Sequence, residues 1–97
     1  MARIVLLLGR KPFDAERWKA LFPAVQLRFG TTLRDAREAL HAEDIDSVIL
    51  GAGLALETRL EVVSLVFTAS NKTTVHMKDR DSGRDGMPDF VRSVIRA

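Results

Sequence analysis

Short apolar runs alternate along the chain with stretches whose apolar residues recur at the helical period. The runs at 4–8 and 48–50 are apolar at every position, which is typical of strands covered by helices on both faces. The runs at 25–29 and 74–78 alternate apolar with polar residues, which indicates half-exposed strands. We therefore expect two central strands and two edge strands.

Helix start signals lie between these runs. Asp14 is suited to cap a first helix, and Thr32 with Asp35 three residues later resembles a capping box at the start of a second. Pro88 is favoured in the first turn of a last helix. That helix has a continuous apolar stripe at helical spacing, formed by Met87, Phe90, Val91, Val94 and Ile95.

Four strands and four helices in strict alternation predict an α/β fold with three layers, α/β/α, and a four-stranded parallel sheet. Each strand–helix–strand unit closes with a right-handed crossover, so successive strands are parallel. With the first and third strands central, the strand order is 2-1-3-4, which is flavodoxin-like or Rossmann-like. This order places a topological switch point between the first and third strands.

The third helical stretch has more apolar surface than one small sheet can cover. One stripe consists of Leu56, Leu60, Val63 and Phe67, and a neighbouring stripe consists of Val62, Leu65, Val66 and Ala69. The helix is either broadly buried between the sheet and an adjacent helix, or it has a surface for self-association. We take the second stripe, together with His76 of the fourth strand, as the candidate interface of a homodimer.

Length and composition limit what the chain can be. A chain of 97 residues predicts a single domain over residues 1–97, with one core and no room for a large enclosed active site. The absence of cysteine excludes disulfides, thiolate metal sites and a cysteine nucleophile, and it fits a reducing cytoplasm. The apolar run at 4–8 is too short for a signal peptide or a membrane span, so we expect a soluble cytoplasmic protein with no membrane partner.

The charged residues favour no nucleic-acid partner. The 15 Lys and Arg residues nearly balance the 13 Asp and Glu residues, and they are scattered instead of clustered. Trp18 and Phe22 have the spacing of a helix core face and not of a base-stacking platform. The sequence therefore does not favour nucleic-acid binding.

Candidate ligand-binding residues gather where three strands are expected to end: Gly9, Arg10, Lys11, Gly51, Gly53, Lys78, Asp79 and Ser82. Ligands of open α/β sheets bind beyond these strand ends, at the switch point. Backbone N–H groups at 51–53, the positive end of the helix that follows them and the cations after the first strand could hold a small anion. No dinucleotide fingerprint or phosphate loop is complete, so glycines that only form tight turns are the alternative.

We assign no metal, cofactor or catalytic residue. The acidic segment 79–86 fits no calcium loop, since that register places Gly83 or Arg92 at positions that need an oxygen ligand. His76 has no partner at a recognised triad spacing, so a catalytic role is disfavoured and the sequence favours a protein that is not an enzyme.

The segments 4–10, 31–40 and 46–51 resemble response-regulator receiver domains, and the similarity covers residues 3–53. In that family an acidic pair follows the first strand and a phospho-accepting Asp ends the third. Here Arg10 and Lys11 stand at the first place and Gly51 at the second, so phosphorylation on Asp is not implied. The resemblance implies a degenerate relative that acts through protein contacts.

The leading hypothesis is therefore a non-enzymatic, receiver-like interaction domain that forms a homodimer. The alternative is a small protein that binds a phosphate or nucleotide ligand at the strand ends.

Overall fold

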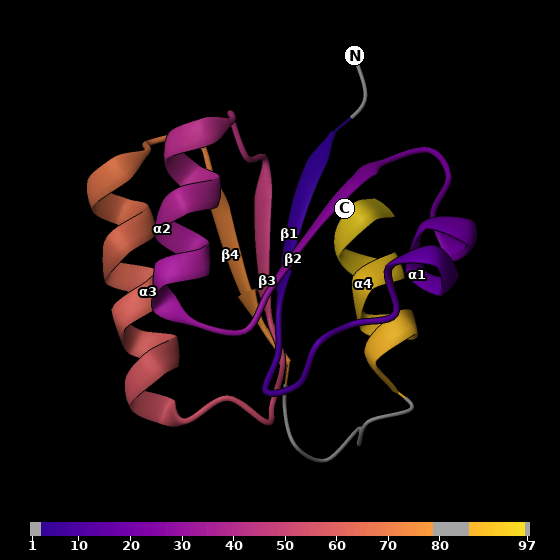
Figure 1. Ribbon diagram of the computed structural model, residues 1–97. Helices are drawn as coiled ribbons and strands as arrows, with labels where there is room; N and C mark the ends of the chain where they lie inside the picture. Colours follow the sequence, from indigo (N-terminus) through magenta and orange to yellow (C-terminus); the bar gives the residue numbers. More distant parts are fainter. Residues whose placement is uncertain (1–2, 79–85, 97) are drawn as a thin grey trace.

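A computed structural model describes residues 3–78 and 86–96 of the chain. Strands and helices alternate along the sequence, and Figure 1 shows the sheet between two helical layers. The elements are β1 (Ile4–Leu8), α1 (Ala15–Leu21), β2 (Gln26–Gly30), α2 (Leu33–Ala42), β3 (Ser47–Leu50), α3 (Leu56–Ala69), β4 (Thr74–Met77) and α4 (Met87–Arg96).

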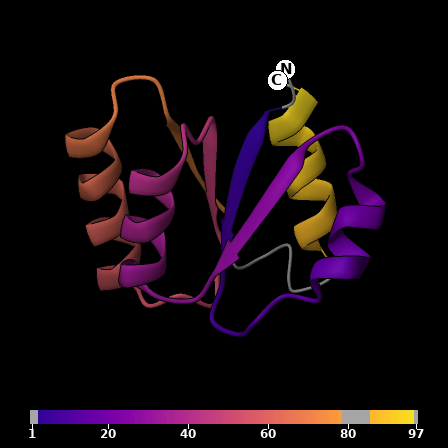
Figure 2. The ribbon, with the colours of Figure 1, turned by 45° about the horizontal axis from the view of Figure 1, so that its top comes forward.

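The sheet has four strands in the order β2-β1-β3-β4, and every neighbouring pair is parallel. Helices α2 and α3 cover one face, and α1 and α4 cover the other (Figures 1 and 2). This arrangement confirms the predicted three-layer α/β fold and its strand order. The switch point lies between β1 and β3, where the connections leave toward opposite faces.

Side-chain alternation along the two central strands divides the core into two parts. Leu6, Leu8, Val48 and Leu50 pack on the side of α2 and α3. Val5, Leu7 and Ile49 pack on the side of α1 and α4, together with the predicted α4 stripe residues Met87, Val91 and Val94. Both faces of β1 and β3 are therefore apolar because both are covered.

The predicted helix starts are confirmed. The Asp14 carboxylate accepts a hydrogen bond from the Arg17 backbone N–H at the start of α1. At α2, the Thr32 hydroxyl accepts from the Asp35 N–H, and the Asp35 carboxylate accepts from the Thr32 N–H, which completes a capping box.

Helix α3 presents the opposite stripe from the one expected at an interface. Val62 and Val66 are fully buried against the sheet, so the prediction that they form an exposed association surface is wrong. The apolar side chains left in solvent are Leu56, Leu60 and Phe67, which are 57%, 54% and 73% exposed. One helix contacts a sheet through a single stripe, and here the more central pair of valines forms that contact.

The remaining candidate interface residues are divided between these environments. Leu65 is half-buried and packs against the core on the side of α2 and α3, whereas Ala69 is exposed at the last turn of α3. His76 is half-buried on β4, and its ring Nε2 lies 3.0 Å from the Thr74 hydroxyl. No helix in the described ranges has both the length and the apolar character required to cross a membrane.

Candidate functional site

A concavity of about 920 Å³ lies where β1, β3 and β4 end, on the side of the sheet covered by α1 and α4. We call it the rim concavity. Its lining residues are Gly9, Arg10, Lys11, Pro12, Phe13, Asp14, Arg17, Trp18, Leu21, Gly51, Ala52, Gly53, Lys78, Met87 and Pro88. They come from the connections after β1 and β3, from the end of β4, from α1 along its length and from the first turn of α4.

Six of the eight ligand-binding candidates line this one concavity: Gly9, Arg10, Lys11, Gly51, Gly53 and Lys78. The other two, Asp79 and Ser82, lie outside the described residues. The structure therefore brings together groups that are up to 69 positions apart in sequence, from Gly9 to Lys78.

Close approach of the chain explains two of the glycines. The Gly51 N–H donates to the Leu8 carbonyl at 2.8 Å, and a Cβ at Gly51 would lie 3.3 Å from that carbonyl oxygen. A Cβ at Gly53 would lie 3.2 Å from the Arg10 Cβ, so the Arg10 side chain passes directly beside Gly53. No left-handed backbone is involved at either position, so the glycines serve close approach and not a special φ.

Cationic side chains dominate the charge of the described lining. Arg10, Lys11, Arg17 and Lys78 face one acidic residue, Asp14, whose carboxylate caps α1. Excess positive charge within a concave site raises the local concentration of anions. The described lining thus favours an anionic ligand.

Lys78 differs from its expected environment. The alternation of β4 predicts a half-exposed position beside His76, but the residue is only 3% exposed. Its backbone N–H donates to the Leu50 carbonyl at 2.9 Å, which extends the contact between β4 and β3 by one residue and places Lys78 at the inner wall of the rim concavity.

Aromatic residues form the wall on the side of α1. The rings of Phe13 and Trp18 meet edge to face with centroids 5.6 Å apart, and Phe13 also contacts Phe29 at 5.5 Å. Trp18 is half-buried in this cluster and borders the concavity. The helical spacing of Trp18 in the sequence predicts its packing in the core, but it does not predict that the ring also borders the concavity.

The sequence analysis missed the contributions of α1 and α4: Phe13, Arg17, Trp18, Leu21, Met87 and Pro88. A signal exists for the residues near the start of α1, because this helix closely follows the Gly9 to Lys11 segment and begins near the same strand end. The sequence contains no such signal for Leu21 or for the residues of α4. The helix that was expected to border the site is α3, which follows residues 51–53. The structure instead places the first turn of α4 in the lining.

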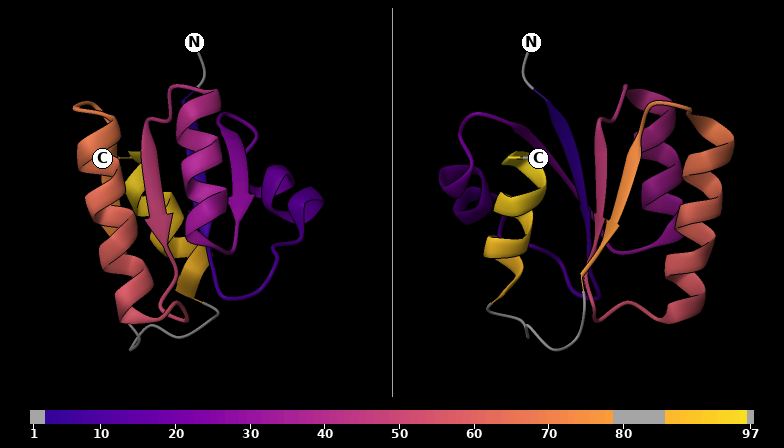
Figure 3. Two further views of the ribbon diagram at one scale, coloured as in Figure 1. Left: turned by 60° about the vertical axis from the view of Figure 1, so that its left-hand side comes forward. Right: turned by 180° about the vertical axis from the view of Figure 1, so that it is seen from behind.

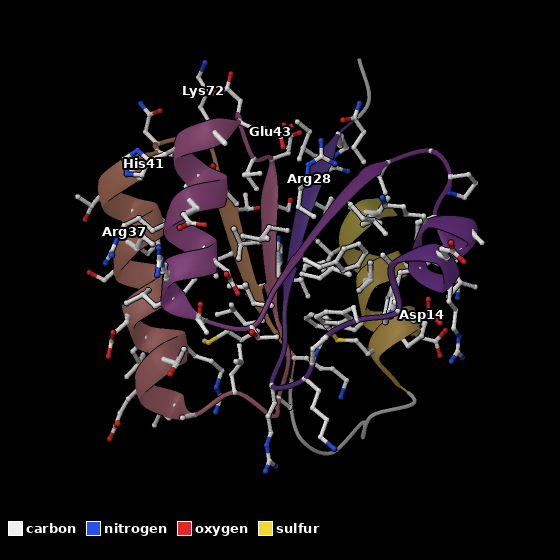
Figure 4. All side chains as sticks on the ribbon, in the orientation of Figure 1. Asp14, Arg28, Arg37, His41, Glu43 and Lys72 are labelled. Carbon is white, nitrogen blue, oxygen red and sulfur yellow. The ribbon has the colours of Figure 1, made fainter. Side chains whose placement is uncertain are left out.

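Among the described residues, none of the groups with a shifted pKa lines the rim concavity. At the end of the sheet where strands begin, the Arg28 guanidinium donates to the Glu43 carboxylate, with Nε–Oε1 at 2.6 Å and Nη2–Oε2 at 2.8 Å (Figure 4). This hydrogen bond raises the pKa of Arg28 and lowers the pKa of Glu43. Arg28 is thus engaged in an ion pair far from the rim concavity.

Across residues 3–78 and 86–96, no group of three or more His, Asp and Glu side chains is placed to hold a metal ion. The acidic segment weighed for metal binding lies mainly at 79–85, outside those ranges. Comparison of the chain with protein-family models, curated proteins and solved structures finds no match. The resemblance of residues 3–53 to receiver domains stays an expectation from the sequence.

Proposed function

We propose that this protein binds a small ligand with a phosphate group, and that the rim concavity is its site. The observation that carries the proposal is the convergence of four cationic side chains on one concavity at the topological switch point. Charge-assisted hydrogen bonds from guanidinium and ammonium groups are the interactions that phosphates accept best. This reverses the order of the two sequence hypotheses, because Val62 and Val66 of the expected interface are buried.

Different parts of the wall suit different parts of such a ligand. Arg10 and Lys11 supply exposed charge from the connection after β1, while Lys78 supplies a buried ammonium at the end of β4. Gly51 and Gly53 let the connection after β3 lie close to that after β1, and Gly53 places the Arg10 side chain directly beside it. The half-buried Trp18 offers an aromatic surface for a nucleobase, so a nucleotide is the preferred ligand class.

The test is a thermal-shift and calorimetric titration of the purified chain with ATP, ADP, AMP, inorganic phosphate and adenosine. We expect the nucleotides to raise the melting temperature and adenosine to have little effect, because it lacks the phosphate. A ligand at 100 times its Kd adds about 2.7 kcal/mol of apparent stability, which is readily detected. No shift with any phosphate-bearing compound would overturn the proposal.

A charge-matched pair of variants locates the site. Arg10→Ala with Lys11→Ala is expected to weaken nucleotide binding at least about tenfold, since each charged hydrogen bond lost costs roughly 1.5–3 kcal/mol. Arg34→Ala with Arg37→Ala removes the same net charge from α2, on the other side of the sheet, and should leave binding unchanged (Figure 4). An equal loss in both variants would indicate non-specific attraction and contradict a site at the rim.

A second candidate function is the non-enzymatic, receiver-like interaction domain that forms a homodimer. The observation that favours it is the exposure of Leu56, Leu60 and Phe67 on one helix face. Both proposals describe a binding protein with no assigned catalytic group, and we also propose a cytoplasmic location, which the cysteine-free sequence supports.

A further inference from the structure

We propose that two copies of this chain associate about a two-fold axis, with β4 pairing antiparallel to its own copy and the exposed α3 stripes packing together. The result is one continuous eight-stranded sheet. This interface lies on the edge of the molecule and uses none of the rim concavity residues except the end of β4. It is independent of the proposed ligand.

Strand β4 has an open side. Within residues 3–78 and 86–96 it is the last strand of the sheet and pairs with β3 alone (Figure 3, right). The backbone N–H groups of Thr74 and Lys78 donate toward β3. Because these directions alternate along a strand, the N–H and C=O groups of Val75 and Met77 point away from the sheet.

The sequence of β4 contains little that blocks pairing. Natural edge strands are blunted by short length, charged residues or proline; β4 has four residues, but it reads Thr-Val-His-Met, with no proline and no Lys, Arg, Asp or Glu within it. A two-fold axis at His76 would place Val75 opposite Met77 of the copy, and Met77 opposite Val75. Both outward-pointing residues would then exchange hydrogen bonds in an antiparallel ladder, which makes this register the one that satisfies the edge most fully.

An apolar helix face adjoins that edge. At 3.6 residues per turn, Leu56, Leu60 and Phe67 point within about 40° of one another and about 120° away from the valine contact with the sheet. We call these three residues the outer stripe. Helix α3 runs opposite to the strands, with α2 beside it over the same face of the sheet (Figure 3, left). Because the helix is right-handed, a turn of about 120° from the valine contact places the outer stripe on the flank away from α2, toward the open side of β4.

Met77 extends the apolar surface from the helix to the strand. Its side chain projects from the same face of the sheet as that of Val75, which packs against the core beneath α2 and α3. Met77 is 48% exposed. The outer stripe and Met77 thus present large apolar side chains along one edge of the molecule, which is the type of surface that marks an association site.

The spacing of a two-fold dimer fits both features at once. Helix α3 contacts β4, and its buried valines belong to the same core cluster as Val48 and Leu50 of β3. An axis midway between these two strands, which are about 4.8 Å apart, would place the two α3 axes of a β4-paired dimer about 10 Å apart. Packed helices are separated by about 8–10 Å, so this placement allows the outer stripes to meet when the strands pair.

A second copy is the occupant that this edge fits best. An open strand edge requires another strand, and an uncharged apolar stripe requires an apolar surface; a two-fold axis supplies both from the same sequence.

The test is the mass of the protein by analytical ultracentrifugation from micromolar to about 1 mM. We expect a concentration-dependent rise from 10.8 kDa to twice that mass. Leu60→Asp with Phe67→Asp should shift the dimer dissociation constant upward by at least about 100-fold, because it buries charge at the interface. Leu21→Asp, at an apolar position of α1 that is 41% exposed, is the control and should leave association unchanged.

A second pair of variants tests the strand separately. Met77→Pro removes one outward N–H without touching the β3 ladder, whereas Met77→Ala shortens the side chain but keeps that N–H. We expect the proline variant to weaken association at least about tenfold more than the alanine variant. Urea unfolding of each variant as a monomer establishes that it folds.

The outcomes are decisive. A wild-type protein that stays monomeric at about 1 mM, or a dimer that survives the double aspartate variant, would overturn the proposal. Equal effects of Met77→Pro and Met77→Ala would exclude the strand pairing. The Arg10→Ala with Lys11→Ala variant should dimerise normally, so failure of the ligand proposal and failure of this one are distinguishable.

Discussion

The turns that lead into α2 and α3 begin helices in opposite ways. At α2, the Asp35 carboxylate accepts hydrogen bonds from the backbone N–H groups of Thr31 at 2.8 Å and Thr32 at 3.2 Å, and the Thr32 hydroxyl accepts from Asp35. At α3, the first position is Ala55, which makes no side-chain cap. The chain therefore satisfies the start of α2 internally and leaves the start of α3 without a side-chain acceptor.

The electrostatics of the two turns follow from this difference. The backbone N–H of Thr31 is the main cause that lowers the pKa of Asp35, so the carboxylate stays ionised at the positive end of α2. The turn between β3 and α3 has no such acid, and its glycines border the cationic rim concavity. The turn into α2 is closed by a side-chain acceptor, and the turn into α3 is not.

The largest expected effect comes from the glycine at the closed turn. A Cβ at Gly30 would lie 2.7 Å from the Asp35 Cβ and 2.9 Å from the Leu8 Cδ2, both inside contact distance. Because neither atom is at the end of a free side chain, we expect Gly30→Ala to lower the free energy of unfolding by about 1–3 kcal/mol. Urea denaturation measures the loss.

Gly53→Ala is the matched control at the open turn. The added methyl group would meet the Cβ of the exposed Arg10 at 3.2 Å, and that connection can move by a few tenths of an ångström. We expect a change within about 0.5 kcal/mol. Equal destabilisation at the two positions would contradict the distinction between a closed and an open turn.

The next largest effect is expected from Asp35→Ala, which removes three backbone and side-chain hydrogen bonds at the start of α2. Loss of such a cap costs about 1 kcal/mol, up to about 2. The effect depends on pH. Because the folded-state pKa of Asp35 is lowered, its contribution is complete above the ordinary Asp value of 3.8 and is lost as the pH falls through the folded-state pKa.

The difference in stability between wild type and Asp35→Ala should therefore be constant from pH 7 to about pH 5 and shrink below pH 4. Thermal unfolding at each pH measures it. Asp44→Ala, at an exposed position after α2, removes the same charge without a cap and should show a much smaller difference. If the difference in stability between wild type and Asp35→Ala stays unchanged at low pH, Asp35 acts through packing and not through its charge.

Local signals in the sequence were sufficient to predict the fold. Apolar runs separate the covered strands from the edge strands, and Asp14 and the Thr32–Asp35 capping box each act within one turn of their own position. Such signals depend on neighbours along the chain. Parallel pairing and right-handed crossovers then leave few ways to arrange four units.

Local sequence signals were not sufficient to predict which of the two apolar stripes of α3 faces the sheet. Both have helical spacing, and the sequence contains no mark that tells which one meets the sheet. The choice depends on the rotation of the helix over β3 and β4, which the whole core determines. In the structure Val62 and Val66 are buried, whereas Leu56 and Leu60 of the other stripe are exposed.

The rim concavity was predictable in its strand-end residues and not in its walls. Gly9, Gly51 and Lys78 meet there because parallel strands end at one edge of a sheet. Trp18 and Met87 join them through the packing of α1 and α4, which no spacing in the sequence encodes. Periodicity assigns such residues to a core, and only the assembled layers show which of them also border solvent.

The smallest expected effect, and the sharpest comparison of the two turns, comes from giving α3 the cap that α2 already has. Ala55 has an extended backbone with φ −59° and ψ 143°, a conformation in which a serine side chain can accept from the first-turn N–H groups. We expect Ala55→Ser to raise the free energy of unfolding by about 0.5–1 kcal/mol.

Ala69→Ser, at the other end of the same helix, makes the same chemical change where no N–H group lacks a partner, and it should be neutral or slightly destabilising. If Ala55→Ser gains nothing over Ala69→Ser, the first-turn N–H groups of α3 are already satisfied and the turn is as closed as that of α2. If it stabilises the protein without weakening nucleotide binding, the open cap of α3 and the rim concavity are separate features, as expected from the lining by α4 and not by α3.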